Sequence, residues 1–519
     1  MFTNPRIRPD FALAVEGFAL DQSVDPGEPI RLCCASQRPT SIAVTVSRIG
    51  AQREVVWLGG GIAVEPQPVP DKAYRLGCEW PVTVEIPTEG WRSGFHEIEL
   101  RDEHLADDDP AARSHAFAVV RAGSPSGDAI LLVLATNTYQ AYNTWGGGCL
   151  YTGAKEVSFR RPIDRGFVFR PPAAYDGRVA SIAPDGDPGH HQLLDYLDEH
   201  RYPLWCASSG WHNWERRFVR WAESAGFEID VAVNADLETI PGLLDGYRLV
   251  CSVGHDEYWS WGMRDAFDSF VERGGNHLIL SGNTSFWQVR LDHERGVMVC
   301  HKGSAPRTDD VADPTRMTHI WSSPAIGRPE TSTTGLSFTR GGYVRVGRGV
   351  LRSSGAYTVH RSDHWAFAGT DLCDGDLLGL GSYVVGYEVD GCAFTTIDGV
   401  PVPTYEDGAP ESLEILASSP ARLLSKQGDV DELPAAIWAD ASGPGDLEDV
   451  ATILYGSASP EHTDRLAHGQ AMIATFRRGA GTVFNVGSTD WCYGLDSDPL
   501  IQRVTANVIH RLAGESGDV

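Results

Sequence analysis

The stretch from Tyr247 to Asn283 constrains the fold of this chain more than any other. It opens with an apolar run, Leu249–Val253, which is short and followed by glycine, as in a buried parallel strand. A helical pattern starts near Ser260 and stops at two glycines, and a second apolar run, His277–Leu280, ends in Ser-Gly-Asn. The pattern predicts a strand–helix–strand unit.

Polar side chains follow both predicted strands of this unit. His255, Asp256 and Glu257 come after the first strand, and Asn283 comes after the second. In open α/β sheets, ligands bind outside the carboxyl ends of the strands. We therefore expect these side chains to line a ligand site at one edge of a sheet.

The chain beyond about residue 128 alternates strand-like with helix-like segments. Strands are expected at Ala129–Ala135 and Glu228–Val233, and helices near His190–His200, at Trp214–Ala225 and at Pro499–Leu512. This alternation predicts an α/β core with a doubly wound parallel sheet, glutamine-amidotransferase-like or flavodoxin-like.

The first part of the chain is expected to form a separate unit. Short alternating apolar runs such as Ile42–Val46 and Val82–Ile86 are separated by Pro-Gly, Gly-Gly and Pro-Thr pairs, a rhythm typical of an immunoglobulin-like β-sandwich. We therefore predict two domains, an N-terminal immunoglobulin-like β-sandwich at 1–122 and an α/β catalytic domain at 128–519. Short strands prevail again at about 340–490, so the second domain is expected to end in β-rich C-terminal additions.

The charge balance restricts the partners of the chain. Its 519 residues include 70 acidic and 43 basic ones, which gives a net charge of -27. Such a surface repels phosphate backbones and anionic lipids, so we expect neither nucleic acid nor a membrane as a partner. The cysteines form no C-x-x-C pair and the first residues lack a secretory pattern, which favours a reduced, cytoplasmic protein. A neutral or cationic small molecule is the better ligand.

Two of the polar residues suggest chemistry by their spacing. His255 and Glu257 point the same way if the strand continues through them, because side chains alternate along a strand. A carboxylate there could bind a hard metal, and the imidazole could move protons for a bound water. Alternatively, Glu257 caps the start of the following helix, where its charge suits the helix dipole. The sequence leaves both interpretations open.

Four further residues have two interpretations each. Tyr142 and Tyr151 flank three glycines that could fold the chain back, and phenolate oxygen suits ferric iron, yet both rings could be ordinary aromatic packing. Asn283 could hydrogen-bond a carbonyl group or merely cap a turn. Glu388 lies in an apolar strand, where its carboxylate needs a partner, so it could serve acid–base chemistry or pair with a structural arginine.

Short motifs, taken together in their order and spacing, point to a known family. They are TYQAYN (138–143), SFRRPI (158–163), GHDEYWSW (254–261), SGNTSFW (281–287), GYE (386–388) and VTANVIHRL (504–512). With these motifs the chain resembles the large (beta) subunit family of N,N-dimethylformamidase. The resemblance runs from the β-rich start to the last helix and so covers most of the chain.

The resemblance implies a mononuclear iron (Fe3+) site and names its residues. By position along the chain, the resemblance implies Tyr142, Tyr151 and Glu257 as the metal ligands. The catalytic residues are His255, Asn283 and Glu388. Tyr139 and Tyr175 rank behind the first two tyrosines as metal ligands.

The expected function is that of an iron-dependent amidohydrolase, which cleaves the C–N bond of a small neutral amide such as N,N-dimethylformamide to a carboxylate and an amine. A small subunit or a homo-oligomer is the expected assembly. Tyr258, Trp259, Phe286 and Trp287 could form an apolar pocket or be ordinary core. The alternatives are a hydrolase of another small amide or ester on the same metal site, and a non-catalytic scaffold or binding protein that retains the fold.

Overall fold

The computed structural model of the chain describes residues 12–125, 129–171, 196–197, 199–302, 311–344, 354–425 and 446–514. Most of the helix expected near His190–His200, and Tyr175, lie outside these residues. None of the helices in the described ranges combines the length and the apolar character needed to span a bilayer.

The N-terminal part folds into two sheets that share one hydrophobic core. The smaller sheet has the order β1 (Val15–Ala19), β3 (Ile30–Ser36), β6 (Val82–Ile86). The larger has the order β2 (Ser23–Val24), β8 (Arg113–Val120), β7 (Gly94–Asp102), β4 (Thr40–Ile49), β5 (Arg53–Val64). In β4, Val44 and Val46 are buried and Thr45 between them is not, as the alternation of a sheet with one core face requires. The immunoglobulin-like type of this sandwich and its boundary at residue 122 stay predictions.

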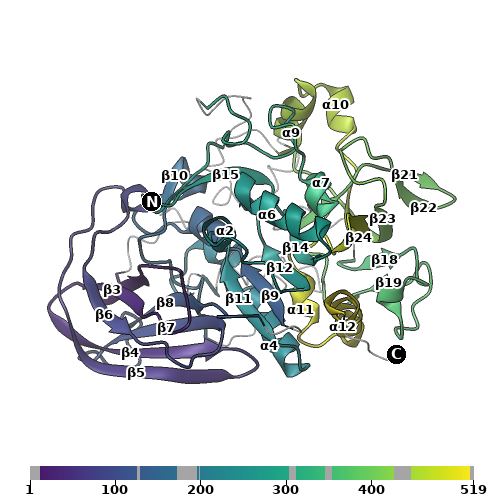
Figure 1. The fold of residues 1–519 in the computed structure, drawn as a ribbon. Coiled ribbons are helices and arrows are strands. Elements are labelled where there is room, and N and C mark those ends of the chain that lie inside the picture. The colour runs from purple at the N-terminus through teal and green to yellow at the C-terminus, as the bar shows by residue number, and fades with distance from the viewer. Residues whose placement is uncertain are drawn as a thin grey trace.

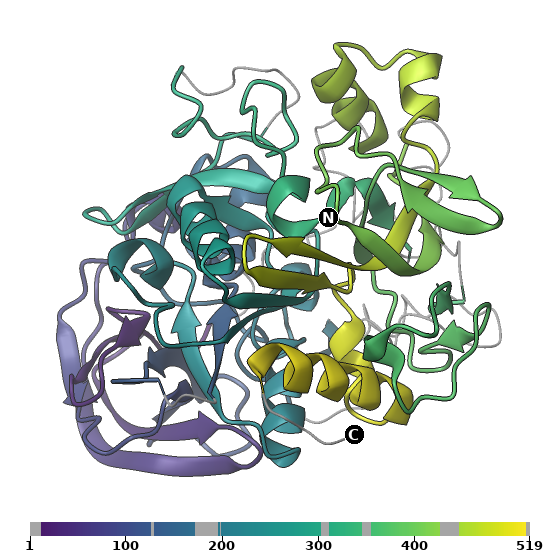
Figure 2. The same cartoon turned by 45° about the vertical axis from the view of Figure 1, so that its right-hand side comes forward.

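A nine-stranded mixed sheet occupies the centre of the molecule (Figures 1 and 2). Its order is β11 (Ile229–Val233), β9 (Ile130–Leu134), β12 (Leu249–His255), β14 (Asn276–Gly282), β25 (Gly481–Asn485), β24 (Gly469–Arg478), β23 (Glu414–Ala421), β18 (Tyr357–Val359), β19 (Leu377–Leu378). The first five strands are parallel to one another, and from β25 to β19 each neighbouring pair is antiparallel.

The predicted fold class, a doubly wound α/β core, is therefore wrong. The unit around β12 and β14 exists as expected, with α6 (Trp261–Glu272) as its crossover helix. However, β9 leads only into the seven-residue helix α2 (Thr136–Tyr142) rather than a crossover helix, and half of the central sheet is antiparallel. The apolar runs were correctly expected as strands, but their partners come from distant parts of the chain, which local periodicity does not encode. The β-rich region expected at about 340–490 agrees with this sheet.

Helices cover both faces of the parallel half of the sheet. On one face, α6 packs Met263 and Phe267 against the apolar side chains of the strands. On the other face lie α4 (Glu215–Ser224) and α12 (Pro499–Ala513), with Phe218 and Val504 in a second core (Figure 1). Since β9 and β12 are buried along their whole length on both sides, the position of their ends is fixed.

The remaining elements form smaller sheets and short helices around this core. A four-stranded sheet has the order β10 (Glu156–Ser158), β16 (Val297–Val299), β15 (Trp287–Asp292), β13 (Tyr258–Ser260), and two pairs are β17 (Ser337–Tyr343) with β20 (Glu388–Gly391) and β21 (Phe394–Ile397) with β22 (Val400–Pro403). The short helices within the described ranges are α1 (Ala73–Leu76), η1 (Leu150–Thr152), η3 (Leu204–Ala207), α5 (Asp236–Thr239), α7 (Thr331–Thr334), η4 (Trp365–Phe367), α9 (Asp446–Tyr455), α10 (Pro460–Asp464) and α11 (Trp491–Gly494).

A close backbone contact at Gly282 joins β20 to the end of β14. A methyl group added at Gly282 would overlap the carbonyl oxygen of Glu388 and lie 2.6 Å from the amide nitrogen of Thr489. We expect Gly282→Ala to lower the free energy of unfolding by about 1–3 kcal/mol, because backbone on both sides must shift. Gly60→Ala is the control, since its methyl group would meet only the Glu103 carboxylate at 3.4 Å. Equal denaturation midpoints for the two variants would contradict the expectation.

Candidate active site

The structure brings the polar residues expected at a sheet edge to the carboxyl ends of neighbouring parallel strands. β12 ends at His255, and β14 ends at Gly282, immediately before Asn283. β9 leads into α2, whose last residue is Tyr142. Since β9, β12 and β14 are adjacent and parallel, these ends lie side by side (Figure 1).

Three oxygen-bearing side chains meet at this edge, and we call Tyr142, Tyr151 and Glu257 the phenol–carboxylate cluster. The hydroxyl group of Tyr142 donates to Oε2 of Glu257 at 3.1 Å. The Tyr151 hydroxyl oxygen lies 2.6 Å from that of Tyr142 and 2.8 and 3.0 Å from the two Glu257 oxygens. Tyr142 is 3% and Glu257 2% exposed, so the oxygens converge away from bulk water.

A tight loop between the two tyrosines makes this convergence possible. Gly146 and Gly147 have φ values of 82° and 96°, in the left-handed region that glycine adopts without strain. A side chain at Gly146 would also lie 2.6 Å from the backbone nitrogen of Tyr74. The chain can therefore turn back on itself, and the rings of Tyr142 and Tyr151 lie 4.2 Å apart between centroids.

Glu257 does not cap the following helix. The N-cap of α6 is Ser260, whose hydroxyl group accepts the amide N–H of Met263 at 3.2 Å. The backbone N–H of Glu257 donates to the Thr138 hydroxyl group at 3.0 Å, which ties the residue to α2. Its carboxylate is therefore turned toward the tyrosines, and the capping interpretation is wrong.

His255 lies between two carboxylates. Its Nε2 is 2.8 Å from Oε2 of Glu388 and 3.4 Å from Oε2 of Glu257. Its Nδ1 lies 2.9 Å from the backbone carbonyl oxygen of Ser208, an acceptor, so Nδ1 carries a proton. Burial lowers the pKa of His255, but Glu388, Glu257 and the Ser208 carbonyl outweigh it and raise the pKa to about 9.

Asn283 and Glu388 complete the edge. Asn283 has a φ of 52°, a left-handed conformation that asparagine tolerates. Its Nδ2 donates to Oε2 of Glu388 at 3.3 Å, and its Oδ1 is buried without a hydrogen-bond donor from the described residues. Glu388, expected to need a partner in its apolar surroundings, has one in His255. The side chains named for catalysis are thus in mutual contact.

Sequence reasoning missed several residues that surround the site. The Tyr387 hydroxyl group lies 3.0 Å from Nδ1 of His255. Asp390 accepts the backbone N–H of Asn283 at 2.9 Å and that of Thr284 at 3.1 Å. Asp390 could have been predicted as a neighbour of the site from its position two residues after Glu388, because residues two apart on a strand share a face.

Lys302 is another missed neighbour, and it follows β16 without any motif. Its ammonium group lies 3.4 Å from the ring centroid of Tyr151 and 3.8 Å from Oε1 of Glu257. Burial lowers the pKa of Lys302, and the charge of Glu257 opposes that shift. The lysine places a cation beside the phenol–carboxylate cluster.

Of the four aromatic residues expected to form a pocket or ordinary core, two lie near the site and two lie in apolar clusters. The Tyr258 hydroxyl group donates to that of Tyr151 at 2.8 Å, and the Trp287 ring lies 5.2 Å from the Lys302 ammonium. Trp259 instead stacks on Phe267 of α6 at 4.6 Å, in the core of the sheet. Phe286 belongs to a separate apolar cluster.

The phenol–carboxylate cluster has the donors that a hard cation requires. Burial raises the pKa values of Tyr142 and Tyr151 well above the usual phenol value, and the Glu257 carboxylate adds to the rise. Two such phenols ionise only beside a strong positive charge. Among the described residues, no group of three His, Cys, Asp or Glu side chains has metal-binding geometry. A metal at this edge would therefore depend on tyrosine oxygen.

Of the two second-choice tyrosines, Tyr139 has its hydroxyl group turned away from this arrangement. The Tyr139 hydroxyl group donates to Oε1 of Glu215 at 2.6 Å. Burial raises the pKa of Glu215 to about 7, and the hydrogen bond from Tyr139 opposes the rise. Tyr139 thus satisfies a buried carboxyl group, and Tyr175 lies outside the described residues.

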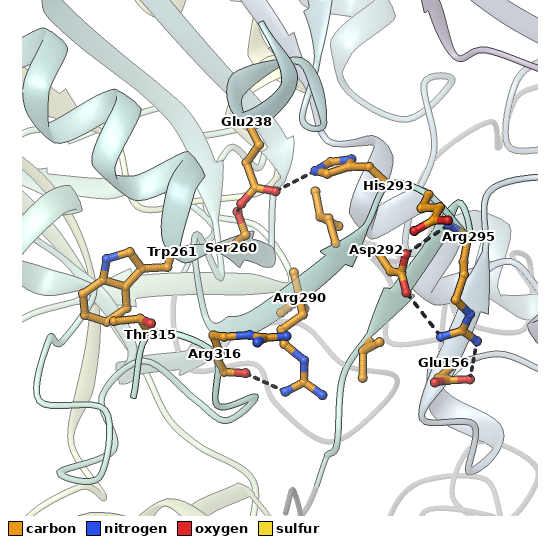
Figure 3. Close-up of a pocket in the computed structure, with 14 residues that line it drawn as sticks. Glu156, Glu238, Ser260, Trp261, Arg290, Asp292, His293, Arg295, Thr315 and Arg316 are labelled. Atoms are coloured by element: carbon orange, nitrogen blue, oxygen red, sulfur yellow. Dashed lines mark hydrogen bonds and ion pairs between the residues drawn. The ribbon is translucent and has the colours of Figure 1, made fainter. Parts of the chain in front are cut away.

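A pocket of about 590 Å³ lies elsewhere, along β15 and β16 (Figure 3). Its charged side chains are joined to one another, as in the pairs Glu238 with His293 at 2.9 Å and Glu156 with Arg295 at 3.3 Å. None of the six residues expected in the site lines it. The chemistry expected from the sequence therefore has no counterpart in this pocket.

Comparison with known proteins points to one family. A family model described as "N,N-dimethylformamidase beta subunit-like, C-terminal" matches residues 43–506. The N,N-dimethylformamidase beta subunit of Alcaligenes sp is 25% identical over 231 residues, which are 42% of this chain and 29% of that protein. The beta subunit of Paracoccus aminophilus is 26% identical over 235 residues, with the same two shares. The match thus spans less than a third of the length of these relatives.

The contact between Tyr139 and Glu215 generates a stability prediction. Tyr139→Phe removes the donor to a fully buried carboxyl group, so we expect the free energy of unfolding to fall by about 1–3 kcal/mol. The phenol–carboxylate cluster does not use this hydroxyl group and should stay intact. Chemical denaturation measures the change, with Tyr405→Phe as the control because that side chain is 38% exposed. Unchanged stability of Tyr139→Phe would contradict the expectation.

Proposed function

Because the chain belongs to the N,N-dimethylformamidase beta subunit-like family, we propose that it hydrolyses the C–N bond of a small neutral amide such as N,N-dimethylformamide. The observation that carries the proposal is the convergence of two phenol oxygens and a carboxylate within 3.1 Å, beside the imidazole of His255. The products are a carboxylate and an amine.

We propose mononuclear Fe3+ as the cofactor, with Tyr142, Tyr151 and Glu257 as its ligands. When bound, the ion would polarise the amide carbonyl group and make water more acidic. Three anionic oxygens are hard donors, which supports ferric iron rather than a softer metal. The Lys302 ammonium group, 3.4 Å from the ring centroid of Tyr151, is placed to modulate this phenol electrostatically.

The neighbouring side chains supply proton transfer and orientation. Glu388 accepts a proton from the attacking water, and His255, held at Nδ1 by the Ser208 carbonyl, returns one from Nε2 to the departing amine. The distance of 2.8 Å between the two groups lets the proton pass from one to the other. Asn283 donates through its Nδ2 to the substrate carbonyl oxygen, which orients the substrate and stabilises the negative charge that develops on that oxygen.

A partner is part of the proposal. The matching relatives are named beta subunits, so we expect assembly with a small subunit or with further copies of this chain. Light scattering measures the oligomeric state of the purified chain. The same purified chain is then assayed for amine release without any added subunit. Activity of the chain alone would make a small subunit unnecessary for chemistry.

The metal ligands are tested by Tyr142→Phe. Ferric tyrosinate absorbs visible light, so we expect wild-type protein loaded with iron to be coloured and to release amine from N,N-dimethylformamide. Tyr142→Phe should lose both properties while keeping its fold, because the ring volume is conserved. Tyr139→Phe is the matched control and should keep both, since its hydroxyl group faces Glu215. Full colour and activity in Tyr142→Phe would exclude this residue as a ligand.

Proton transfer is tested by Glu388→Gln. The amide has the shape of the carboxylate but takes up no proton, so we expect kcat to fall roughly 10²- to 10⁴-fold with iron content and colour retained. Steady-state amine release and elemental analysis measure the two quantities separately. A kcat equal to that of the wild type would remove Glu388 from the mechanism.

A panel of small amides and esters tests the reaction class. Release of amine from formamides but no hydrolysis of esters would support the proposed substrate. Iron-loaded, coloured protein without activity on any member would favour a different reaction at the same site. Colourless protein without iron after expression in iron-rich medium would favour a non-catalytic scaffold.

A further inference from the structure

A single buried guanidinium group holds the segment that carries both tyrosines. Arg161 belongs to the SFRRPI stretch and is 1% exposed. Its Nε donates to the carbonyl oxygen of Ser158 at 2.9 Å, and its Nη2 donates to that of Gln140 at 3.1 Å. Its Nη1 donates to the carbonyl oxygens of Asn143 at 3.0 Å and Trp145 at 2.5 Å.

These four acceptors flank the tyrosines on both sides. The carbonyl groups of Gln140, Asn143 and Trp145 surround Tyr142 at the end of α2, where helix carbonyls lack partners within the helix. The carbonyl of Ser158 comes from β10, after Tyr151. Arg161 therefore joins the two ends of the loop from 140 to 158. Its hydrogen bonds offset part of the entropic cost of closing that loop.

The chemistry of arginine suits this task. Its planar fork presents several N–H donors in fixed directions, whereas the ammonium group of a lysine is a single point. Burial lowers the pKa of Arg161 to about 10, and the charge of Asp164 opposes that shift, so the group stays protonated at neutral pH. The charged guanidinium group thus donates its hydrogen bonds to backbone carbonyl oxygens of the loop.

Neighbouring residues reinforce the same loop. The Asp164 carboxylate accepts the backbone N–H of Thr144 at 2.5 Å and its hydroxyl group at 2.6 Å. The side-chain oxygen of Asn143 accepts the backbone N–H groups of Asp164 at 3.1 Å and Trp145 at 3.2 Å. The segment from Arg161 to Asp164 is therefore bonded along the length of the turn that follows Tyr142.

We propose that Arg161 is a positioning residue, which sets the distance of the Tyr142 and Tyr151 hydroxyl groups from Glu257 and so the affinity of the site for iron. The proposal rests on the proposed function, in which both tyrosines are metal ligands. Arg161 touches neither the cluster nor a substrate, and it acts through the backbone of the loop.

The test compares Arg161→Lys with Arg160→Lys in the 519-residue chain. Arg160 is the preceding residue, but its side chain is exposed and its Nη2 donates to the Glu294 carbonyl at 3.3 Å. We expect Arg161→Lys to bind ferric iron roughly 10- to 100-fold more weakly than wild type, the effect typical of residues that orient metal ligands. Arg160→Lys should bind iron as the wild type does.

Three measurements on each protein separate positioning from general stability. Thermal unfolding of the iron-free proteins reports stability, titration of iron-free protein with iron reports affinity, and release to a chelator reports the dissociation rate. The visible tyrosinate band should shift or weaken in Arg161→Lys, because the oxygen geometry around the ion changes. A purely structural role would lower the unfolding temperature and leave the affinity and band of folded protein unchanged.

The outcomes distinguish this proposal from the proposed function. If the wild type takes up no ferric iron, the proposed function fails and the role of Arg161 with it. If the wild type takes up iron and Arg161→Lys binds it as tightly as Arg160→Lys, only the role of Arg161 is overturned.

Thr144→Val provides the test if Arg161→Lys does not fold. This change removes the hydroxyl bond to Asp164 and keeps the backbone bond, so it loosens the same loop more gently. We expect iron affinity to fall roughly fivefold, the effect of one hydrogen bond. Unchanged affinity and an unchanged band would contradict the proposal.

Discussion

The site depends on one buried carboxylate that needs partners. Glu257 is 2% exposed at the end of a central strand, where an ionised group without compensation would be costly. Two phenol groups donate to it, His255 lies 3.4 Å away and Lys302 lies 3.8 Å away. Because these partners come from separate parts of the chain, the surrounding fold has to hold each of them in register with Glu257.

The central sheet provides that register. Parallel pairing of β9, β12 and β14 places the three strand ends at one edge, and the buried strands leave no room for sliding. β20 reaches the same edge through the close contact at Gly282, which brings Glu388 to His255. Asp390, on the same strand as Glu388, fixes the backbone turn at Asn283. Precision in the site thus comes from backbone contacts as much as from side chains.

The sequence predicted the parts of this arrangement that are local. Apolar periodicity and two glycines predicted the unit of β12, α6 and β14. Because the ends of both strands were predicted, the polar residues that follow each strand were predicted as well. For Tyr142, Tyr151 and Glu388 the residues left two interpretations open, and the resemblance favoured the functional one; the structure places these side chains beside Glu257 and His255. The antiparallel half of the sheet was missed because its pairing partners lie far apart in the chain. Lys302 and the carbonyl of Ser208 were missed because a single lysine and a backbone atom leave no pattern.

The balance of charge explains why phenols, carboxylates and cations are gathered at one edge. With both phenols protonated, the charges of Glu257 and Glu388 can be met by the imidazolium of His255 and by Lys302. Ionisation of both phenols would add two negative charges away from water, which burial opposes. On the proposed function, Fe3+ would match the three charges of two phenolates and one carboxylate, while His255 and Glu388 remain a balanced pair for proton transfer. With the nearby Lys302 ammonium group included, a divalent ion would balance the same three negative charges. On the proposed function, the preference for a trivalent ion therefore rests on the hardness of three anionic oxygen donors and not on the count of charges.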